Sequence, residues 1–299
     1  MGPLVSVGIP TYNRPRGVQR TLEQITTQTY RNLEIIVSDN CSPTPEIKNI
    51  VEKFKERDPR IKFFRQIHNL GMSLNFKFVL KKATGAYFMW AADDDEWDPQ
   101  FIETCVKSLG SASSCMTGFK ILNRARNKLI QSEYPPLSPA YSPYKNASIF
   151  LRKTIANLFY GLHRREEILY YLADYAFDFY DCYFCLKQIL TNGFVINPKT
   201  LFTAGIDNDQ NNIKPFHPKK NKCLEYWPFY YSSLKLITSS NRLKFGEKIN
   251  LIGILTLDVL HYFILYEKNR RAKYVQMFII FFEQIQKRIL NSKFLMRFI

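Results

Sequence analysis

Four consecutive acidic residues, Asp93–Glu96, follow an apolar stretch in the first third of the chain. Carboxylates held this close together repel one another and raise one another's pKa unless a cation neutralises them. A hard divalent cation with oxygen ligands is the usual solution. Such a cation could bridge two phosphates and stabilise the charge on a departing nucleoside diphosphate. From this segment alone, a solvated acidic turn before a helix at Pro99 is an equally good interpretation.

The segments around this cluster alternate between strand and helix. Apolar runs predict short buried strands at Leu4–Ile9, Leu33–Ser38, Ile61–Arg65 and Ala86–Ala91. Helical periodicity predicts helices between them at Arg16–Gln28, Pro45–Asp58 and Ser73–Ala83. This alternation is typical of βαβ units that build a parallel sheet.

Polar residues follow three of these strands, at Thr11–Asn13, Asp39-Asn40 and Asp93–Glu96. Right-handed crossovers bring the carboxyl ends of parallel strands to one edge of the sheet, where ligands bind. We therefore expect the three polar clusters to face one crevice.

Several ordered segments resemble the inverting glycosyltransferases of family 2, which have the GT-A fold. These segments are Val5–Arg14, Gln28–Asn40, Asn69–Gly71, Ala83–Tyr87 and Asp93–Asp95. The match is dense over residues 4–105, weak from 110 to 210 and absent beyond. The resemblance implies an α/β chain with a mixed, mostly parallel, Rossmann-like sheet flanked by helices. A helical C-terminal extension would follow it.

The resemblance implies a nucleotide-base pocket at the first two strand ends. Pro10, Thr11 and Tyr12 would line it, with Tyr12 stacked on the base, and Asn13 belongs to the same donor-binding loop. Asp39 would hydrogen-bond the edge of the base. The donor implied is a nucleotide-diphosphate sugar carrying UDP or dTDP.

The resemblance also implies a metal site at the third strand end. Asp93 would lie near the ribose and the metal, Asp94 would ligate Mn²⁺ or Mg²⁺, and Asp95 would help to position the sugar or the metal. Ala92 stands where the family usually has the first aspartate of its D-x-D motif, so the motif survives here as Asp93-Asp94.

Two further positions depart from the family pattern. Phe76-Lys77 replaces a usual Arg-Asn pair, which makes Lys77 the candidate phosphate contact. Asp207 falls where the family has a metal-proximal histidine. Together with Ala92, these departures keep a catalytically inactive glycosyltransferase-like protein open as an alternative.

An inverting transfer needs a carboxylate that takes the proton of the attacking hydroxyl. The family places this base just before a helix in the second half. Asp174, Asp178 and Asp181 are the candidates here, and Asp181 fits best because an apolar helix is predicted directly after it. Asp178 is the second choice, and an ordinary N-cap role for Asp181 stays open. A helix is also predicted over Leu158–Ala173, and a strand at Phe194–Ile196.

The net charge is +16, from 42 Lys and Arg against 26 Asp and Glu, and aromatic residues reach 15%. A basic chain favours nucleotide phosphates, nucleic acid or an anionic membrane face as partners. A nucleic-acid-binding protein is therefore the alternative from another class. The acidic cluster at the predicted ligand edge argues against it, so we expect no nucleic-acid partner. A nucleotidyltransferase would need a glycine-rich loop after the first strand, and Pro10–Pro15 has no glycine.

We divide the chain into a nucleotide-sugar-binding half (1–105), an acceptor-binding half of the same domain (106–215) and a helical, basic, aromatic region (216–299). The apolar run Ile249–Tyr266 contains Asp258, which is costly at the centre of a bilayer, so we do not expect it to span a membrane. A basic helix predicted within 267–299 would lie on a membrane, on the catalytic domain or on a second subunit, as in a homodimer.

The sequence thus predicts a metal-dependent, inverting, hexosyl-type glycosyltransferase that extends a surface glycan such as lipopolysaccharide or capsule. Six scattered cysteines and the lack of a secretory signal indicate a cytoplasmic location, which includes the inner face of the cytoplasmic membrane. A lipid-linked acceptor would make contact with that membrane useful.

Overall fold

The computed structural model describes residues 2–123, 128–130, 137–153, 156–169, 179–191, 193–206 and 223–266. Its strands are β1 (Val5–Thr11), β2 (Leu33–Asp39), β3 (Ile61–Arg65), β4 (Tyr87–Trp90), β5 (Glu96–Trp97), β6 (Ser114–Asn123), β7 (Lys128–Ile130), β8 (Leu162–Arg164) and β9 (Phe194–Ile206). Its helices are α1 (Pro15–Thr26), α2 (Glu46–Lys55), α3 (Met72–Lys82), α4 (Phe101–Ser108), α5 (Pro143–Lys153), the 3-10 helix η1 (Ala156–Tyr160), α6 (Arg165–Leu169), α7 (Tyr180–Leu190), α8 (Cys223–Ser239) and α9 (Phe245–Tyr266).

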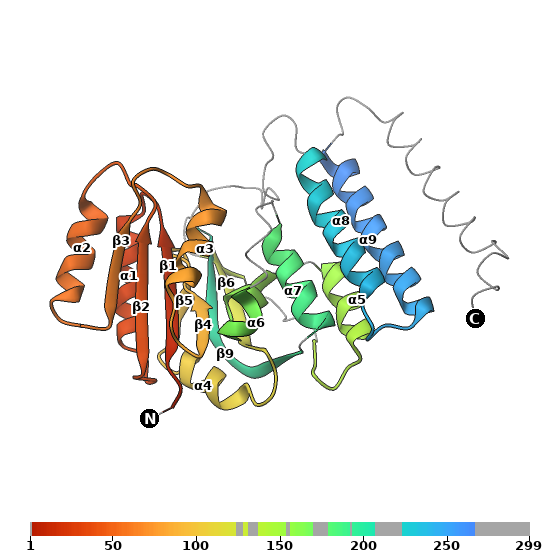
Figure 1. Cartoon of the computed structure of the whole chain (residues 1–299), viewed down its shortest axis with the longest axis horizontal. Helices are drawn as coiled ribbons and strands as arrows, with labels where there is room; N and C mark the ends of the chain where they lie inside the picture. The colour runs from red at the N-terminus through yellow and green to blue at the C-terminus, as the bar shows by residue number, and fades with distance from the viewer. Residues whose placement is uncertain are drawn as a thin grey trace.

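One mixed sheet contains all of these strands in the order β3-β2-β1-β4-β8-β6-β9-β5, and β7 pairs with β6 (Figure 1). The pairs β3-β2, β2-β1, β1-β4 and β6-β9 are parallel, whereas β8 is antiparallel to both of its neighbours and β5 is antiparallel to β9. The mostly parallel α/β sheet flanked by helices, and the helical C-terminal region, are thereby confirmed.

Strands β1 and β2 are mostly apolar because both of their faces are covered. All seven residues of β1 and all seven of β2 are buried. Strands buried on both faces have no polar alternation, which is why the first four predicted strands were recognisable in the sequence. The register pairs Thr11 with Asp39, so these two strands end side by side.

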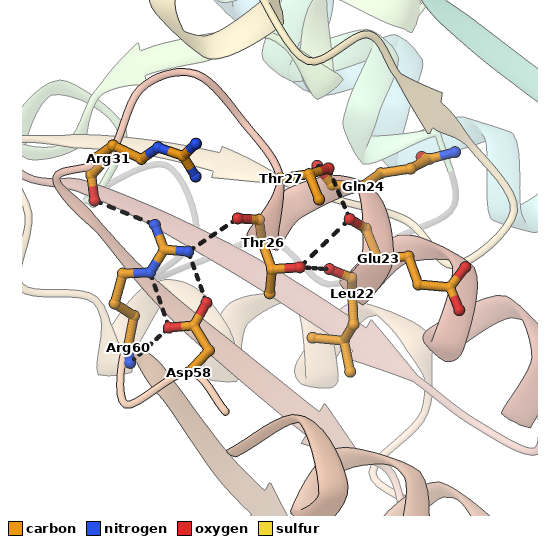
Figure 2. Close-up of polar contacts among 8 residues, drawn as sticks. All are labelled: Leu22, Glu23, Gln24, Thr26, Thr27, Arg31, Asp58 and Arg60. Carbon is orange, nitrogen blue, oxygen red and sulfur yellow. Dashed lines mark hydrogen bonds and ion pairs between the residues drawn. The ribbon is translucent and has the colours of Figure 1, made fainter. Parts of the chain in front are cut away.

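A network at the end of α1 fixes this helix against the sheet (Figure 2). The Thr26 hydroxyl donates to the Leu22 carbonyl at 2.7 Å. Arg60 binds both carboxylate oxygens of Asp58, at 2.9 and 2.6 Å, and donates to the carbonyls of Thr26 and Arg31. Arg60 therefore satisfies the Thr26 carbonyl, which the helix end leaves without an intrahelical partner, and ties it to the segment that leads into β2.

The helix expected over Leu158–Ala173 is wrong in its first part. The chain forms η1, then the strand β8, and only then the short helix α6. Gly161 lets the chain pass close to β6, because a Cβ there would lie 2.4 Å from the Cys115 carbonyl oxygen. β8 inserts between β4 and β6, so long-range pairing overrides the local helical pattern. The strand expected at Phe194–Ile196 is confirmed but extends to Ile206.

The C-terminal helices α8 and α9 pack side by side and lie against α5 and α7 (Figure 1). Buried aliphatic residues such as Ile237 and Leu251 fill their interface, and the hydroxyls of Tyr230 and Thr256 lie 3.1 Å apart across it. Within the described residues, no helix combines the length and the apolar character that a membrane span requires. The predicted basic helix within 267–299 lies outside the described residues.

Glu34 is a buried carboxylate in β2 that the strand pattern concealed. Its Oε1 accepts hydrogen bonds from the hydroxyls of Ser6 and Thr84 and from the amides of Thr84 and Gly85. Its Oε2 accepts one from Lys62 Nζ at 2.7 Å. Burial alone would raise the pKa of this carboxyl, but the bonds from Lys62, Ser6 and Thr84 outweigh it and lower the pKa to about 2.

We expect Glu34→Gln to destabilise the protein at neutral pH and to reduce its acid sensitivity. Glu34's pKa is lowered from 4.5 to about 2, so its contribution is complete above pH 4.5 and is lost as the pH falls towards 2. The shift corresponds to a contribution on the order of 3 kcal/mol. Denaturant unfolding of the variant and the parent at pH 7 and pH 3 measures the difference.

Glu103→Gln is the matched control, because this carboxylate lies on the surface of α4 and pairs with Lys107. Its free energy of unfolding should change little. An equal loss of stability in both variants, or a Glu34→Gln protein that keeps the parent's full acid dependence, would contradict the assignment.

Candidate active site

The aspartate cluster forms the loop between β4 and β5, and α1 packs against the backbone of this loop. A Cβ on Gly17 would lie 2.3 Å from the Asp93 carbonyl oxygen, so only glycine allows α1 to approach so closely. Arg20 Nη2 donates to the same carbonyl at 3.2 Å. The backbone of the loop is therefore fixed before any ligand binds.

Asp93 is one of two buried members of the cluster. Its Oδ2 accepts a hydrogen bond from the Thr11 hydroxyl at 2.7 Å, and its Oδ1 accepts one from Arg14 Nη1 at 2.9 Å. Burial raises the pKa of Asp93, the bonds from Thr11 and Arg14 act against that rise, and the neighbouring charge of Asp94 adds to it. Thr11 thus links the end of β1 to the aspartate loop, as the convergence of strand ends predicts.

Asp94 is the more open member. Its side chain is 33% exposed, and its Oδ2 lies 2.9 Å from the same Arg14 Nη1. Asp95 is buried, and its Oδ1 accepts a hydrogen bond from the Gly205 amide at 3.0 Å. This last bond joins the loop to the end of β9, a strand of the same sheet that pairs in parallel with β6.

The predicted base pocket lies at the ends of β1 and β2. Pro10 is buried, whereas Tyr12 is 46% exposed, and its stacking on a base stays a prediction. Asn13 has a left-handed φ of 54°, and its amide donates to the Ser42 hydroxyl at 2.8 Å. The hydrogen bond from the Asn13 amide to Ser42 therefore helps to set the shape of this loop, in which Tyr12 stays exposed.

Asp39 is completely buried at the end of β2. Its Oδ1 accepts hydrogen bonds from the amide and the hydroxyl of Ser42, and its Oδ2 accepts one from Arg65 Nη1 at 3.1 Å. Arg65 itself is 37% exposed. A base contact by Asp39 stays a prediction, and the geometry adds Arg65 as a neighbouring donor that the sequence analysis missed.

Lys77 lies on α3, whose first turns pack beside β1 and β2. Asn75, two residues earlier, donates to the Ser38 carbonyl at 3.0 Å and to the Thr11 carbonyl at 3.4 Å, which ties the two strand ends together. Lys77 is buried, with only 7% of the residue exposed. Its contact with a phosphate stays a prediction.

Asp181 lies in the first turn of α7 and is half-buried. The helix begins at Tyr180, and Phe179 occupies the N-cap with a left-handed φ of 64°. The N-cap role considered for Asp181 is therefore wrong, although its Oδ1 accepts a hydrogen bond from the Cys182 amide at 2.8 Å. Asp174, Asp178 and Asp207 lie outside the described residues.

An aromatic cluster connects the aspartate loop to α7. The Trp90 ring, at the end of β4, stacks on Phe159 with ring centroids 4.2 Å apart and planes 12° apart. Phe159 meets the Tyr180 and Phe184 rings edge to face at 5.4 and 5.3 Å. This rigid packing fixes Asp181 relative to the loop that follows Trp90.

Tyr160 lies between the two halves of the site. Its ring stacks on Phe202 of β9, with centroids 6.2 Å apart. Burial, and then the charges of Asp95, Asp181 and Asp94, raise the pKa of its hydroxyl well above the usual value. Charges from the aspartate loop and from α7 therefore act on the same phenol, which the sequence analysis did not single out.

The residues fit a divalent cation that shares its coordination with a substrate. No group of three or more histidine, cysteine or acidic side chains suited to a metal occurs in the described part of the chain. Mg²⁺ is commonly bound through one or two carboxylates together with substrate phosphates, and the adjacent oxygens of Asp93 and Asp94 provide that set. The arrangement suits a nucleotide-bound cation better than a cation held by protein alone.

Polar and acidic side chains thus gather at the ends of β1, β2 and β4 of an α/β fold. The family model described as glycosyl transferase family 2 matches residues 6–168. Because this match covers more than half of the chain, the protein belongs to glycosyl transferase family 2.

Relatives with described roles agree with that family. Over 95 residues the chain is 36% identical to GalNAc(5)-diNAcBac-PP-undecaprenol beta-1,3-glucosyltransferase of Campylobacter jejuni, which covers 31% of this chain and 30% of that protein. Over 175 residues it is 29% identical to the putative colanic acid biosynthesis glycosyl transferase WcaA of Escherichia coli, with 56% and 60% covered. The chain thus spans well under two thirds of the length of these relatives.

Solved structures share the fold at low sequence identity. Staphylococcus aureus TarS 1-349 in complex with UDP-GlcNAc matches with a TM-score of 0.70 and 16% identity, over 90% of this chain and 76% of that chain. The mannosyltransferase PcManGT of Pyrobaculum calidifontis, in complex with GDP-Man and Mn²⁺, matches with a TM-score of 0.51 and 15% identity, over 94% and 81%. At such identities the likeness concerns the fold.

Proposed function

We propose that this member of family 2 transfers a hexose from a UDP- or dTDP-sugar to a hydroxyl of a growing cell-envelope glycan, with inversion. The observation that carries the proposal is the convergence of Thr11, Asp93 and the more open Asp94 at one edge of the sheet. Asp181 lies in the first turn of α7, whose Phe184 belongs to the same aromatic cluster as Trp90, shortly before the aspartate loop. The relatives in envelope polysaccharide synthesis support the acceptor class.

The donor lies along the strand ends in this proposal. Tyr12 stacks on the base with its exposed ring, while Asp39 and Arg65 provide polar groups beside it. Asp93 and Asp94 hold Mn²⁺ or Mg²⁺ against the diphosphate, and Asp95 helps to place the sugar. The cation, when bound, offsets the negative charge that develops on the departing diphosphate.

Asp181 acts as the base on the acceptor side. Its carboxylate takes the proton of the acceptor hydroxyl while the hydroxyl oxygen bonds to C1 of the sugar. The bond between C1 and the phosphate oxygen breaks at the same time, and its electron pair leaves with the nucleoside diphosphate. Attack from the face opposite the leaving group inverts the configuration at C1.

The relatives and the basic charge of the chain support the acceptor class and the cellular site that we propose. We place the enzyme at the inner face of the cytoplasmic membrane, where a lipid-linked glycan would be extended. The basic residues of 267–299 provide the membrane contact in this proposal, since polybasic segments bind anionic lipid headgroups. A homodimer through the C-terminal helices is the competing use of the same region.

A binding panel tests the proposed function. We expect UDP or dTDP, and the matching sugar nucleotide, to raise the melting temperature in the presence of Mn²⁺ more than in the presence of EDTA, because a ligand that binds the folded state stabilises it. GDP, CDP and random duplex DNA are the comparison ligands. The proposal would be contradicted if only DNA raised the melting temperature. It would also be contradicted if none of the nucleotides raised it, either with or without Mn²⁺.

A further inference from the structure

Arg14 is held in place by the backbone around it. It follows Asn13, whose left-handed backbone is fixed by Ser42, and it precedes Pro15, which restricts the backbone of the residue before it. Its carbonyl accepts the first hydrogen bond of α1, from the Val18 amide at 3.0 Å. The backbone of Arg14 is therefore fixed beside the aspartate loop, and 37% of its side chain is exposed.

One nitrogen of Arg14 bridges the two carboxylates that are proposed to hold the metal. Nη1 lies 2.9 Å from Asp93 Oδ1 and 2.9 Å from Asp94 Oδ2. A cation shared by two carboxylate oxygens would need the same position. Two cations at that position would repel each other, so the guanidinium and a divalent ion compete for Asp94.

A diphosphate gives the displaced guanidinium a new partner. Arg presents a planar fork of N–H donors that matches phosphate oxygens, and its exposed head lies at the crevice between the aspartate loop and the end of β1. Asp93 also accepts a hydrogen bond from Thr11 through its other oxygen, Oδ2, so a change in the contacts of Arg14 does not require this bond to break.

We propose that Arg14 is a positioning residue that couples binding of the cation to binding of the diphosphate. It neutralises Asp93 and Asp94 in the absence of ligands, yields Asp94 to the cation, and binds the diphosphate in exchange. The inference rests on the proposed function. It explains how a site with few carboxylates avoids taking up cations without a donor, since the nucleotide has to release Arg14 first.

Coupled binding is measured by titrating Mn²⁺ with and without UDP and following the electron paramagnetic resonance signal of free Mn²⁺. We expect UDP to raise the Mn²⁺ affinity of the parent protein by about tenfold or more. In Arg14→Gln, Mn²⁺ should bind about tenfold more tightly without UDP, and the enhancement by UDP should shrink by a similar factor. Arg14→Lys, which keeps the charge but lacks the fork, should fall between them.

Arg16→Gln is the matched control, because Arg16 is exposed in the first turn of the same helix and its replacement changes the net charge equally. It should behave like the parent. If Arg14→Gln binds Mn²⁺ as the parent does and shows the same enhancement by UDP, the inference is overturned while the proposed function stays intact. If Arg14→Gln fails to fold, the same result in Arg14→Lys has the same consequence. A parent protein that binds neither Mn²⁺ nor UDP would overturn the proposed function itself.

Discussion

Asp181→Asn is expected to lower the turnover number for sugar transfer by about a thousandfold while leaving the affinity for the donor nucleotide unchanged. A positioned general base contributes about 10² to 10⁴ in rate, and asparagine keeps the shape of aspartate but cannot take the proton. Release of nucleoside diphosphate in the presence of the glycan acceptor measures turnover, and the shift in melting temperature with the nucleotide measures binding.

Two comparisons make the Asp181 result specific. Glu166→Gln removes an exposed carboxylate from the first turn of α6 and should leave turnover unchanged. Asp178→Asn tests the second candidate base from the sequence. A large loss in Asp178→Asn with normal turnover in Asp181→Asn would transfer the role to Asp178, and a loss of nucleotide binding in Asp181→Asn would indicate a structural role instead.

Asp94→Asn is expected to abolish the Mn²⁺-dependent part of donor binding and to lower turnover by at least a hundredfold. Asp94 is the more open of the two carboxylates that face Arg14, so its oxygen is the accessible ligand for a cation on the diphosphate. Titration of UDP at fixed Mn²⁺ and in EDTA measures the effect. The affinities in the two buffers should become equal in the variant.

Asp98→Asn is the control for Asp94, because Asp98 is exposed four residues further along and its replacement keeps the oxygen that accepts a hydrogen bond from the Gln100 amide. We expect this variant to retain the parent's dependence on Mn²⁺. Undiminished Mn²⁺-dependent turnover in Asp94→Asn would remove the metal role from this residue.

The converging strand ends were predictable because local patterns determine them. Apolar runs without alternation reveal strands buried on both faces, and the polar residues that end them must then meet at one edge of a parallel sheet. This reasoning predicts from the sequence that Thr11 and Asp93 lie at the same edge, and their side chains are in hydrogen-bond contact. The α/β fold class followed from the alternation of strands and helices along the chain.

The missed features depend on partners far away in the sequence. Arg14 and Asp93 are 79 residues apart, and Gly205 and Asp95 are 110 residues apart, so no periodicity reveals either contact. β8 was mistaken for helix because Leu162–Arg164 acquires strand geometry only by inserting between β4 and β6. Glu34 was hidden in an apolar run, since its stabilisation comes from donors on three other segments.

The most direct test of the account is anomalous diffraction at the manganese edge from crystals grown with Mn²⁺ and UDP. The account predicts one strong anomalous peak within bonding distance of an Asp94 carboxylate oxygen and of the diphosphate, with the uracil against Tyr12. A peak bonded elsewhere on the protein, or UDP bound away from the ends of β1, β2 and β4, would contradict it.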